Sequence, residues 1–177
     1  SLLHLASLDY NTFSHCQNTA IYAVALGGLV GIVGDGLREL ALGSLLIDVG
    51  TVEVPREILY KEGSLTSEEW EIVKKHPITG AKMVKKILPH EPMIALIVAQ
   101  HHERFDGSGY PYGLNKKQIH YFSQIVAIAD TFDALTTNRP YAKAMSGYEA
   151  MMFILYHQKG LLDLELFKKF IGLLRKD

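Results

Sequence analysis

The sequence lacks several features that would point to particular classes of protein. One cysteine, Cys16, stands alone among 177 residues, so no disulfide can form within the chain, as is usual in a reducing compartment. Positive and negative charges nearly balance, with a net charge of −1, and this excludes binding to a nucleic-acid polymer through overall charge. We therefore expect a cytoplasmic protein without a nucleic-acid partner.

A membrane-spanning run is also missing. The least polar stretch, residues 19–34, is shorter than the ~20 apolar residues that a spanning helix needs, and four glycines interrupt it. The first residues, Ser1-Leu2-Leu3-His4, have neither the basic start nor the cleavage site of a signal peptide. At 48% hydrophobic residues, we expect one globular domain over residues 1–177. Its abrupt apolar start suggests a fragment of a longer chain with an N-terminal domain.

What the chain does have is apolar residues at helical spacing over most of its length, whereas strand patterns are nearly absent. Thr66 and Glu69 have the spacing of a capping box, and Pro77 suits the first position of the next helix. Residues 49–65 predict a long irregular connection. The pattern predicts an all-α bundle of about seven or eight helices, near residues 12–33, 36–47, 67–75, 77–88, 92–102, 119–137, 147–158 and 163–175.

Two adjacent histidines introduce the most informative segment. His101 and His102 end an apolar helical run and lead into the loop Glu-Arg-Phe-Asp-Gly-Ser-Gly-Tyr-Pro-Tyr-Gly-Leu, residues 103–114. Neutral imidazole is the commonest metal ligand in proteins, and glycine allows backbone conformations that other residues resist. The segment therefore indicates a metal site beside a shaped loop. The alternative is a pair of surface histidines before an ordinary turn.

Two carboxylates lie in otherwise apolar sequence. Asp48 follows Leu-Leu-Ile at the end of a predicted helix, and Asp130 lies within Val-Ala-Ile-Ala-Asp-Thr-Phe. An unpaired buried charge is costly, so a cation is expected beside each, and a metal held by imidazoles would supply it. The alternatives are backbone amides at a helix end for Asp48, and a buried ion pair with a residue such as Arg139 for Asp130.

The order of residues in this loop resembles that of a known family. His-His-Glu-x-x-Asp-Gly-Ser-Gly-Tyr-Pro-x-Gly-Leu resembles the signature of HD-GYP domains, bacterial members of the HD phosphohydrolase superfamily that hydrolyse the second messenger cyclic di-GMP. Residues 127–142 are similar to the family's Ala-Asp-x-Phe-Asp-Ala-Leu-Thr-x-x-Arg-Pro-Tyr run. The resemblance covers residues 9–170. It implies the HD-superfamily helical bundle, with an ordered loop around Gly109, Tyr110 and Pro111.

The resemblance also implies a set of metal ligands. In HD-GYP domains a helix histidine, the His-Asp doublet, a Lys-His-Pro histidine, a His-His pair and a later aspartate bind two or three metals. The matching positions are His15, Asp48, His76, His101, His102 and Asp130. The implied centre is binuclear. One position combines Asp48 with the last three histidines, and a more open one combines His15, Asp130 and the shared Asp48. Nitrogen and oxygen ligands without thiolate favour iron first, with manganese or zinc as alternatives.

Several family positions are changed in this chain. Ile47 replaces the histidine of the doublet, and Thr51 replaces a lysine that is thought to position or protonate the phosphate. Ala142 replaces a basic residue that contacts substrate. A glutamate that binds a third metal in some members would fall near Asn11, so we expect no third metal. These changes predict weakened rather than unaltered catalysis.

Other residues are expected to support the site. Arg139 and the nearby Lys143 are candidate phosphate contacts, with a structural ion pair at a helix end as the alternative for Arg139. Glu103 would orient His101 or His102, or face solvent. In the family, the loop with Gly-Tyr-Pro is implicated in contacts with the GGDEF cyclases that make the messenger. These proteins are therefore implied as partners; a loop that only rigidifies the site is the alternative.

The implied function is metal-dependent hydrolysis of cyclic di-GMP to linear pGpG, GMP or both, with Asp48 and Thr51 as the catalytic positions. A second hypothesis belongs to another class: a catalytically degenerate cyclic di-GMP receptor or GGDEF-binding module that retains a structural metal centre. A third is an HD-superfamily hydrolase of another nucleotide.

Overall fold

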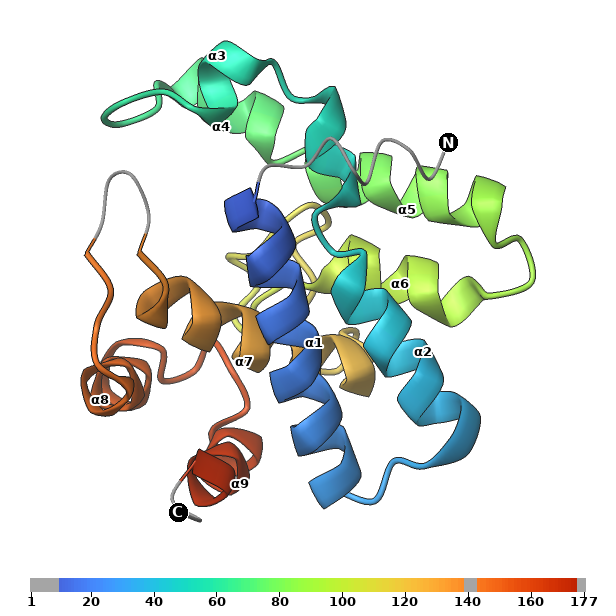
Figure 1. The fold of residues 1–177 in the computed structure, drawn as a ribbon, viewed down its shortest axis with the longest axis vertical. Coiled ribbons are helices and arrows are strands. Elements are labelled where there is room, and N and C mark those ends of the chain that lie inside the picture. The colour runs from blue at the N-terminus through green and yellow to red at the C-terminus, as the bar shows by residue number, and fades with distance from the viewer. Residues whose placement is uncertain (1–9, 139–142, 175–177) are drawn as a thin grey trace.

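The computed structural model describes residues 10–138 and 143–174 (Figure 1). The described residues contain helices and no strand, apart from isolated bridges of Asp106 with Asn115 and Lys159 with Leu162. The all-α prediction is confirmed, and each of the eight expected helices is present. They are α1 Tyr10–Leu29, α2 Gly34–Leu45, α4 Ser67–Val73, α5 His76–Ile87, α6 Pro92–Gln100, α7 Tyr121–Thr136, α8 Gly147–His157 and α9 Leu164–Leu174.

The connection predicted to be irregular holds two further short elements, the 3₁₀ helix η2 (Val49–Glu53) and α3 (Arg56–Leu59). The first helix ends at Leu29, four residues earlier than the expected bound, because Gly31 takes φ +88°, which is left-handed and breaks the helix. The capping box before α4 is confirmed: the Glu69 amide donates to Thr66 Oγ1, and Glu69 Oε2 accepts from the Thr66 amide.

Two apolar clusters form the core. The main cluster gathers residues of α1, α2 and α6–α9 and of the turns beside them, including Leu26, Phe132 and Ile47, which follows α2. The second cluster joins η2, α5 and α6, and includes Val49, Val84 and Ile94. Asp48 lies in the chain between Ile47 of the main cluster and Val49 of the second. The chain therefore crosses from one apolar cluster to the other at an aspartate.

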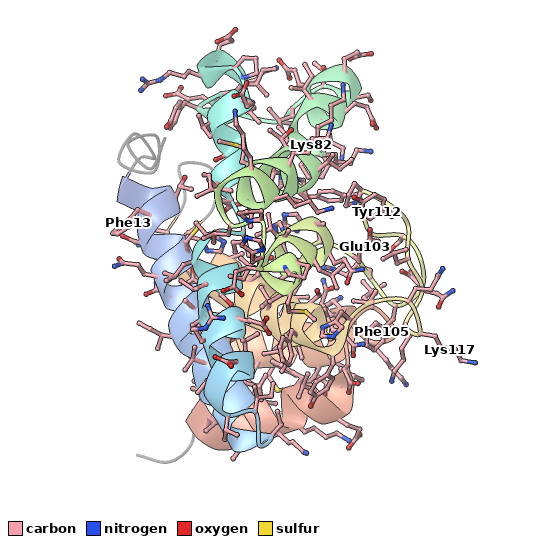
Figure 2. The ribbon with its side chains drawn as sticks, turned by 90° about the vertical axis from the view of Figure 1, so that its right-hand side faces the viewer. Phe13, Lys82, Glu103, Phe105, Tyr112 and Lys117 are labelled. Atoms are coloured by element: carbon pink, nitrogen blue, oxygen red, sulfur yellow. The ribbon has the colours of Figure 1, made fainter. Side chains whose placement is uncertain are left out.

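Helix packing brings distant residues to this crossing. Helix α1 packs against α2 and α7, α2 also packs against α6, and α5 packs against both α6 and η2 (Figure 1). The loop that follows α6 runs along one side of the molecule, with Glu103, Tyr112 and Lys117 on it and Phe13 of α1 on the opposite side (Figure 2). Among the described helices, none is long and apolar enough to cross a membrane.

Candidate metal centre

Four of the predicted ligands converge. One atom each from Asp48, His76, His101 and His102 lies within 4.8 Å of all the others. They come from three places: the turn between α2 and η2, the first residue of α5, and the end of α6. Within residues 10–138 and 143–174, this is the one group of at least three histidine, cysteine or carboxylate side chains close enough to hold a metal ion.

The orientation of two imidazoles fits a cation. His76 Nδ1 donates to the Val73 carbonyl and His101 Nδ1 donates to the Val98 carbonyl, each at 2.8 Å. In a neutral ring, Nε2 then carries a lone pair, and the two Nε2 atoms face one another at 3.3 Å. Two lone pairs at that distance repel unless a metal ion accepts both or a proton on one ring lies between them. The donor set of three nitrogens and one oxygen therefore fits a resident metal.

Burial favours the neutral rings that metal binding requires. Burial, together with the neighbouring His76, lowers the pKa of His101 to about 4. Burial also holds the pKa of His102 well below its ordinary value, with His101 adding to the effect. Neither ring therefore competes for a proton near neutral pH.

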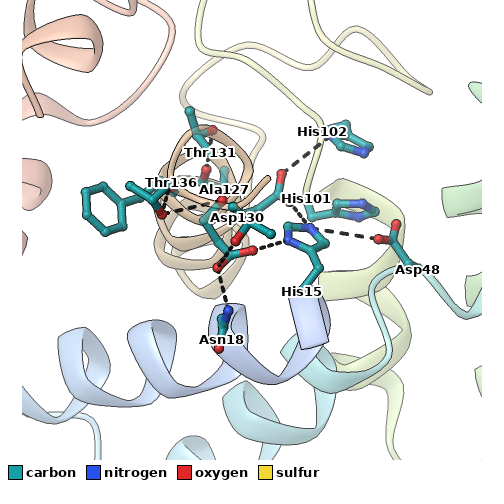
Figure 3. Close-up of polar contacts among 12 residues, drawn as sticks. His15, Asn18, Asp48, His101, His102, Ala127, Asp130, Thr131 and Thr136 are labelled. Carbon is teal, nitrogen blue, oxygen red and sulfur yellow. Dashed lines mark hydrogen bonds and ion pairs between the residues drawn. The ribbon is translucent and has the colours of Figure 1, made fainter. Parts of the chain in front are cut away.

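His15 lies in a different arrangement beside this group (Figure 3). Its Nε2 lies 2.9 Å from Asp130 Oδ1, and its Nδ1 lies 2.6 Å from Asp133 Oδ2. Burial alone would lower the pKa of His15, but the hydrogen bonds with Asp130 and Asp133 raise it to about 10. A metal that uses His15 must therefore displace a tightly held proton.

The group of four converging ligands and the contacts of His15 with Asp130 and Asp133 lie next to each other. His15 Nε2 lies 3.9 Å from Asp48 Oδ2, and His102 Nδ1 lies 3.8 Å from Asp130 Oδ2. Burial alone would raise the pKa of Asp130, but the hydrogen bond with His15 and the charge of that protonated ring lower it, so the carboxylate stays ionised. All six expected ligands thus share one region, while their roles as ligands stay a prediction.

The contacts of Asp48, His101 and Asp130 bear on the alternatives expected from the sequence. Asp48 makes no capping hydrogen bond to backbone amides; its Oδ1 lies 3.3 Å from His76 Nε2 instead. His101 is fully buried, so it is not a surface histidine. Asp130 pairs with His15. Arg139, its suggested partner, lies outside the described residues, as do Ala142 and the side chain of Asn11.

Two of the changed family positions, Ile47 and Thr51, do not supply a catalytic side chain in place of the one that the family has. Ile47 is fully buried in the main cluster. The Thr51 hydroxyl donates to the Asp48 carbonyl at 2.7 Å, so its proton is used to hold the turn that carries Asp48. Lys143 is exposed just before α8, where its charge acts on Glu149.

The role expected for Glu103 is wrong. We expected it to orient an imidazole or face solvent, but its buried carboxylate accepts hydrogen bonds from the backbone of its own loop. Oε1 accepts from the Tyr112 amide at 2.7 Å and Oε2 from the Leu114 amide at 2.8 Å. A buried carboxylate that binds two amides closes the loop on itself. Glu103 therefore shapes the loop.

The loop is tied to the ligands by close contacts. The Tyr110 amide donates to the His102 carbonyl at 3.2 Å, and the Tyr110 ring lies 4.6 Å from the His102 ring, inclined by 31°. At Gly109 an added Cβ would lie 2.5 Å from that same carbonyl oxygen. Only glycine fits there without moving His102. The residues before Pro111 thus pack directly on a predicted ligand.

Sequence reasoning missed Asp133. Its Oδ1 accepts hydrogen bonds from the side-chain amide of Asn18 at 2.8 Å and from the Thr137 hydroxyl at 3.1 Å. Its Oδ2 pairs with His15 Nδ1 and so holds the orientation of that ring. The sequence does contain a signal for this residue. Asp133 follows Asp130 by three positions in apolar sequence, and residues three apart lie on the same face of a helix.

Comparisons with known proteins agree with this geometry. Residues 9–166 match the HD domain family. The chain is 34% identical to a cyclic di-GMP phosphodiesterase of Pseudomonas aeruginosa, over 97% of this chain and 41% of that protein. It is 36% identical to a 3′3′-cGAMP-specific phosphodiesterase of Vibrio cholerae, over 88% of this chain and 36% of that protein. The chain thus spans less than half the length of these relatives.

A solved structure supports the fold. The HD-GYP-type protein Bd1817 from Bdellovibrio bacteriovorus superposes with a TM-score of 0.77, at 24% identity, over 97% of this chain and 56% of that one. The family match and the relative identical at 34% over nearly the whole chain decide membership. The chain belongs to the HD domain family, as a member of HD-GYP type with isoleucine in place of the histidine of the His-Asp doublet.

Proposed function

We propose that this chain is a metal-dependent phosphodiesterase that hydrolyses cyclic di-GMP to linear pGpG, GMP or both, at a rate lowered by its replaced residues. The observation that carries the proposal is the pair of Nε2 atoms of His76 and His101, facing one another at 3.3 Å beside Asp48. Relatives that are named cyclic di-GMP phosphodiesterases support the substrate class.

The residues divide into two groups in this proposal. Asp48, His76, His101 and His102 hold one metal, and His15 and Asp130 complete a weaker second position with Asp48. Asp48 and His102 have the most exposed side chains of the six, at 16% and 21%, so a phosphate reaches the centre from their side. A metal bound there lowers the pKa of water and stabilises negative charge on phosphate oxygens.

The substrate needs further contacts that the chain can supply. Arg139 is proposed to bind phosphate through its planar guanidinium, with Lys143 nearby in sequence. Thr51 adds no charge, and its hydroxyl is held by the Asp48 carbonyl. Losing one charged donor to a developing negative charge costs ~10²–10³ in turnover, which is why we propose slow rather than absent catalysis.

A second candidate function rests on the same replacements. Ile47 is packed in the core and Thr51 is tied to backbone, so neither can act on a phosphate. These contacts favour a receptor or GGDEF-binding module that keeps its metals for structure. Hydrolysis of another cyclic dinucleotide is the third candidate, and relatives named for 3′3′-cGAMP favour it.

One experiment separates these candidates. Anaerobically purified protein, loaded with ferrous iron or manganese, is incubated with cyclic di-GMP or 3′3′-cGAMP, and the products are resolved by chromatography. We expect linear product from cyclic di-GMP, and none from Asp48→Ala. Unchanged substrate at a full metal complement would favour the receptor. Faster cleavage of 3′3′-cGAMP would support the third candidate.

The cofactor, partners and location complete the proposal. We expect a binuclear centre with iron, and manganese or zinc as substitutes; a metal analysis below two per reconstituted chain would contradict it. GGDEF-domain proteins are proposed partners through Gly109, Tyr110 and Pro111. A cytoplasmic location follows from the proposed substrate, an intracellular messenger. That residues 1–177 form one domain of a longer chain stays a prediction.

A further inference from the structure

Trp70 is the one tryptophan of the chain, and it lies on helix α4, which supplies none of the predicted ligands. Helix α4 buries no residue completely, and the Trp70 side chain is 43% exposed. Its ring meets Tyr110 edge to face, with centroids 5.8 Å apart. Tyr110 in turn lies on the ring of His102. Two ring contacts therefore connect an exposed indole to a predicted ligand.

The two ring contacts begin at the predicted ligand that is most accessible to a substrate. His102 has the most exposed side chain among the predicted ligands, at 21%, compared with 4% for His76 and 8% for Asp130. The aromatic row of His102, Tyr110 and Trp70 thus begins where a phosphate can reach the centre and leads outward from it.

We propose that Trp70 stacks on a purine base of the bound cyclic dinucleotide while the metal ligands hold its phosphate. The inference rests on the proposed function and adds a residue that recognises the base. An indole offers a large flat surface, and each base-to-aromatic stack strengthens binding by a factor of roughly 5 to 150. Every purine has such a face, so Trp70 serves guanine and adenine alike.

Fluorescence tests the inference without turnover, because all indole emission comes from Trp70. Metal-loaded protein is titrated with a hydrolysis-resistant phosphorothioate analogue of cyclic di-GMP, with excitation at the red edge of the indole band. Ribose 5-phosphate, which has no base, serves as the control ligand. We expect saturable quenching by the dinucleotide analogue alone. Binding by calorimetry without a change in emission would overturn the inference.

Steady-state kinetics supplies the second test. Trp70→Ala should raise KM for cyclic di-GMP by roughly 5- to 150-fold, with kcat nearly unchanged. Its rate on a small nitrophenyl phosphodiester without a nucleobase should be unaltered. Trp70→Phe should keep most of the affinity. Tyr148→Ala, which removes an exposed ring from α8, is the matched control. Thermal melting checks that each variant is folded.

The outcomes separate the inference from the proposed function. Hydrolysis of cyclic di-GMP with an unchanged KM in Trp70→Ala would overturn the inference and leave the function standing. An equal loss on both substrates would also overturn it, because Trp70 would then only support Tyr110. A wild-type protein that neither binds nor cleaves cyclic dinucleotides would reject both.

Discussion

At the scale of single residues, backbone carbonyls orient the imidazoles of the centre. Val73 and Val98 each accept a hydrogen bond from the Nδ1 of a histidine three residues further along, so the opposite nitrogen is directed to the cluster. His15 differs, because its Nδ1 binds a carboxylate. A carboxylate partner raises the basicity of a ligating histidine and fixes its ring.

Asp133 should therefore be needed for the second metal position. Asp133→Asn keeps the size of the side chain but removes its charge, and we expect the metal affinity of that position to fall by about 10- to 100-fold. Metal content after dialysis against a graded chelator measures the effect. Asp35→Asn, at an exposed carboxylate, is the control. Equal retention of both metals in the two variants would show that Asp133 does not support the centre.

Restoring the family residues tests whether the chemistry alone is impaired. The double variant Ile47→His, Thr51→Lys should raise the rate of cyclic di-GMP hydrolysis by up to about 10²–10³. It should also unfold more easily without metal, because an imidazole without a partner replaces a fully buried isoleucine at a cost of about 1–3 kcal/mol. Initial rates and thermal melts with and without manganese give both quantities. A stable, metal-loaded variant with no gain would point to a pocket closed to the substrate.

At the scale of elements, the contact between η2 and α5 sets the distance from Asp48 to His76. An added Cβ at Gly50 would lie 2.1 Å from the His76 carbonyl oxygen and 2.6 Å from the Gly80 amide nitrogen. Both obstacles are backbone atoms of α5, which no side-chain rotation can remove. Glycine thus allows the turn that carries Asp48 to lie directly on the helix that carries His76.

Gly50→Ala should accordingly push these two elements apart. We expect a loss of more than about 2 kcal/mol in the free energy of unfolding, together with loss of the tightly bound metal. Gly172→Ala is the matched control, since an added Cβ there meets nothing within 4 Å and alanine suits the interior of α9. Urea unfolding and metal analysis measure both variants. Similar values for the two would contradict the role of this contact.

Sequence patterns predicted the long elements better than the short ones. Helices α5 and α7 have clear apolar spacing and were found within a few residues of their expected bounds. The elements η2 and α3 contain five and four residues, and such short segments carry no periodicity to detect. Glu103 was misjudged for another reason: its partners are amides of its own loop, and residue types alone do not show where a loop folds back.

At the scale of the whole molecule, the candidate centre lies where the two apolar clusters meet. A cation bound there removes the repulsion between the Nε2 atoms of His76 and His101 and compensates Asp48. Metal binding should therefore stabilise the entire fold. At a free metal concentration one hundred times the dissociation constant, the gain is about 2.7 kcal/mol, and the melting temperature should rise by roughly 5–10 °C.

Scanning calorimetry with manganese and with a chelator measures this shift. His101→Ala removes one of the converging nitrogen atoms and is expected to abolish most of the metal-dependent rise. Tyr156→Ala, on the exposed face of α8, should retain it. A melting temperature that does not respond to metal in the wild-type chain would argue that these side chains hold no ion.

The wide separation of the ligands along the chain has one more consequence. Residues 15, 48, 76, 101 and 130 belong to different helices or the turns beside them, and the single cysteine leaves the chain without an internal covalent cross-link. A bound ion would join segments that are 25 to 115 residues apart in the sequence. Unlike a disulfide, it would do so only in the folded domain, because unfolding separates the ligands and releases the ion. The link would therefore be reversible, and the concentration of free metal in the cell would determine how strongly the folded domain is stabilised.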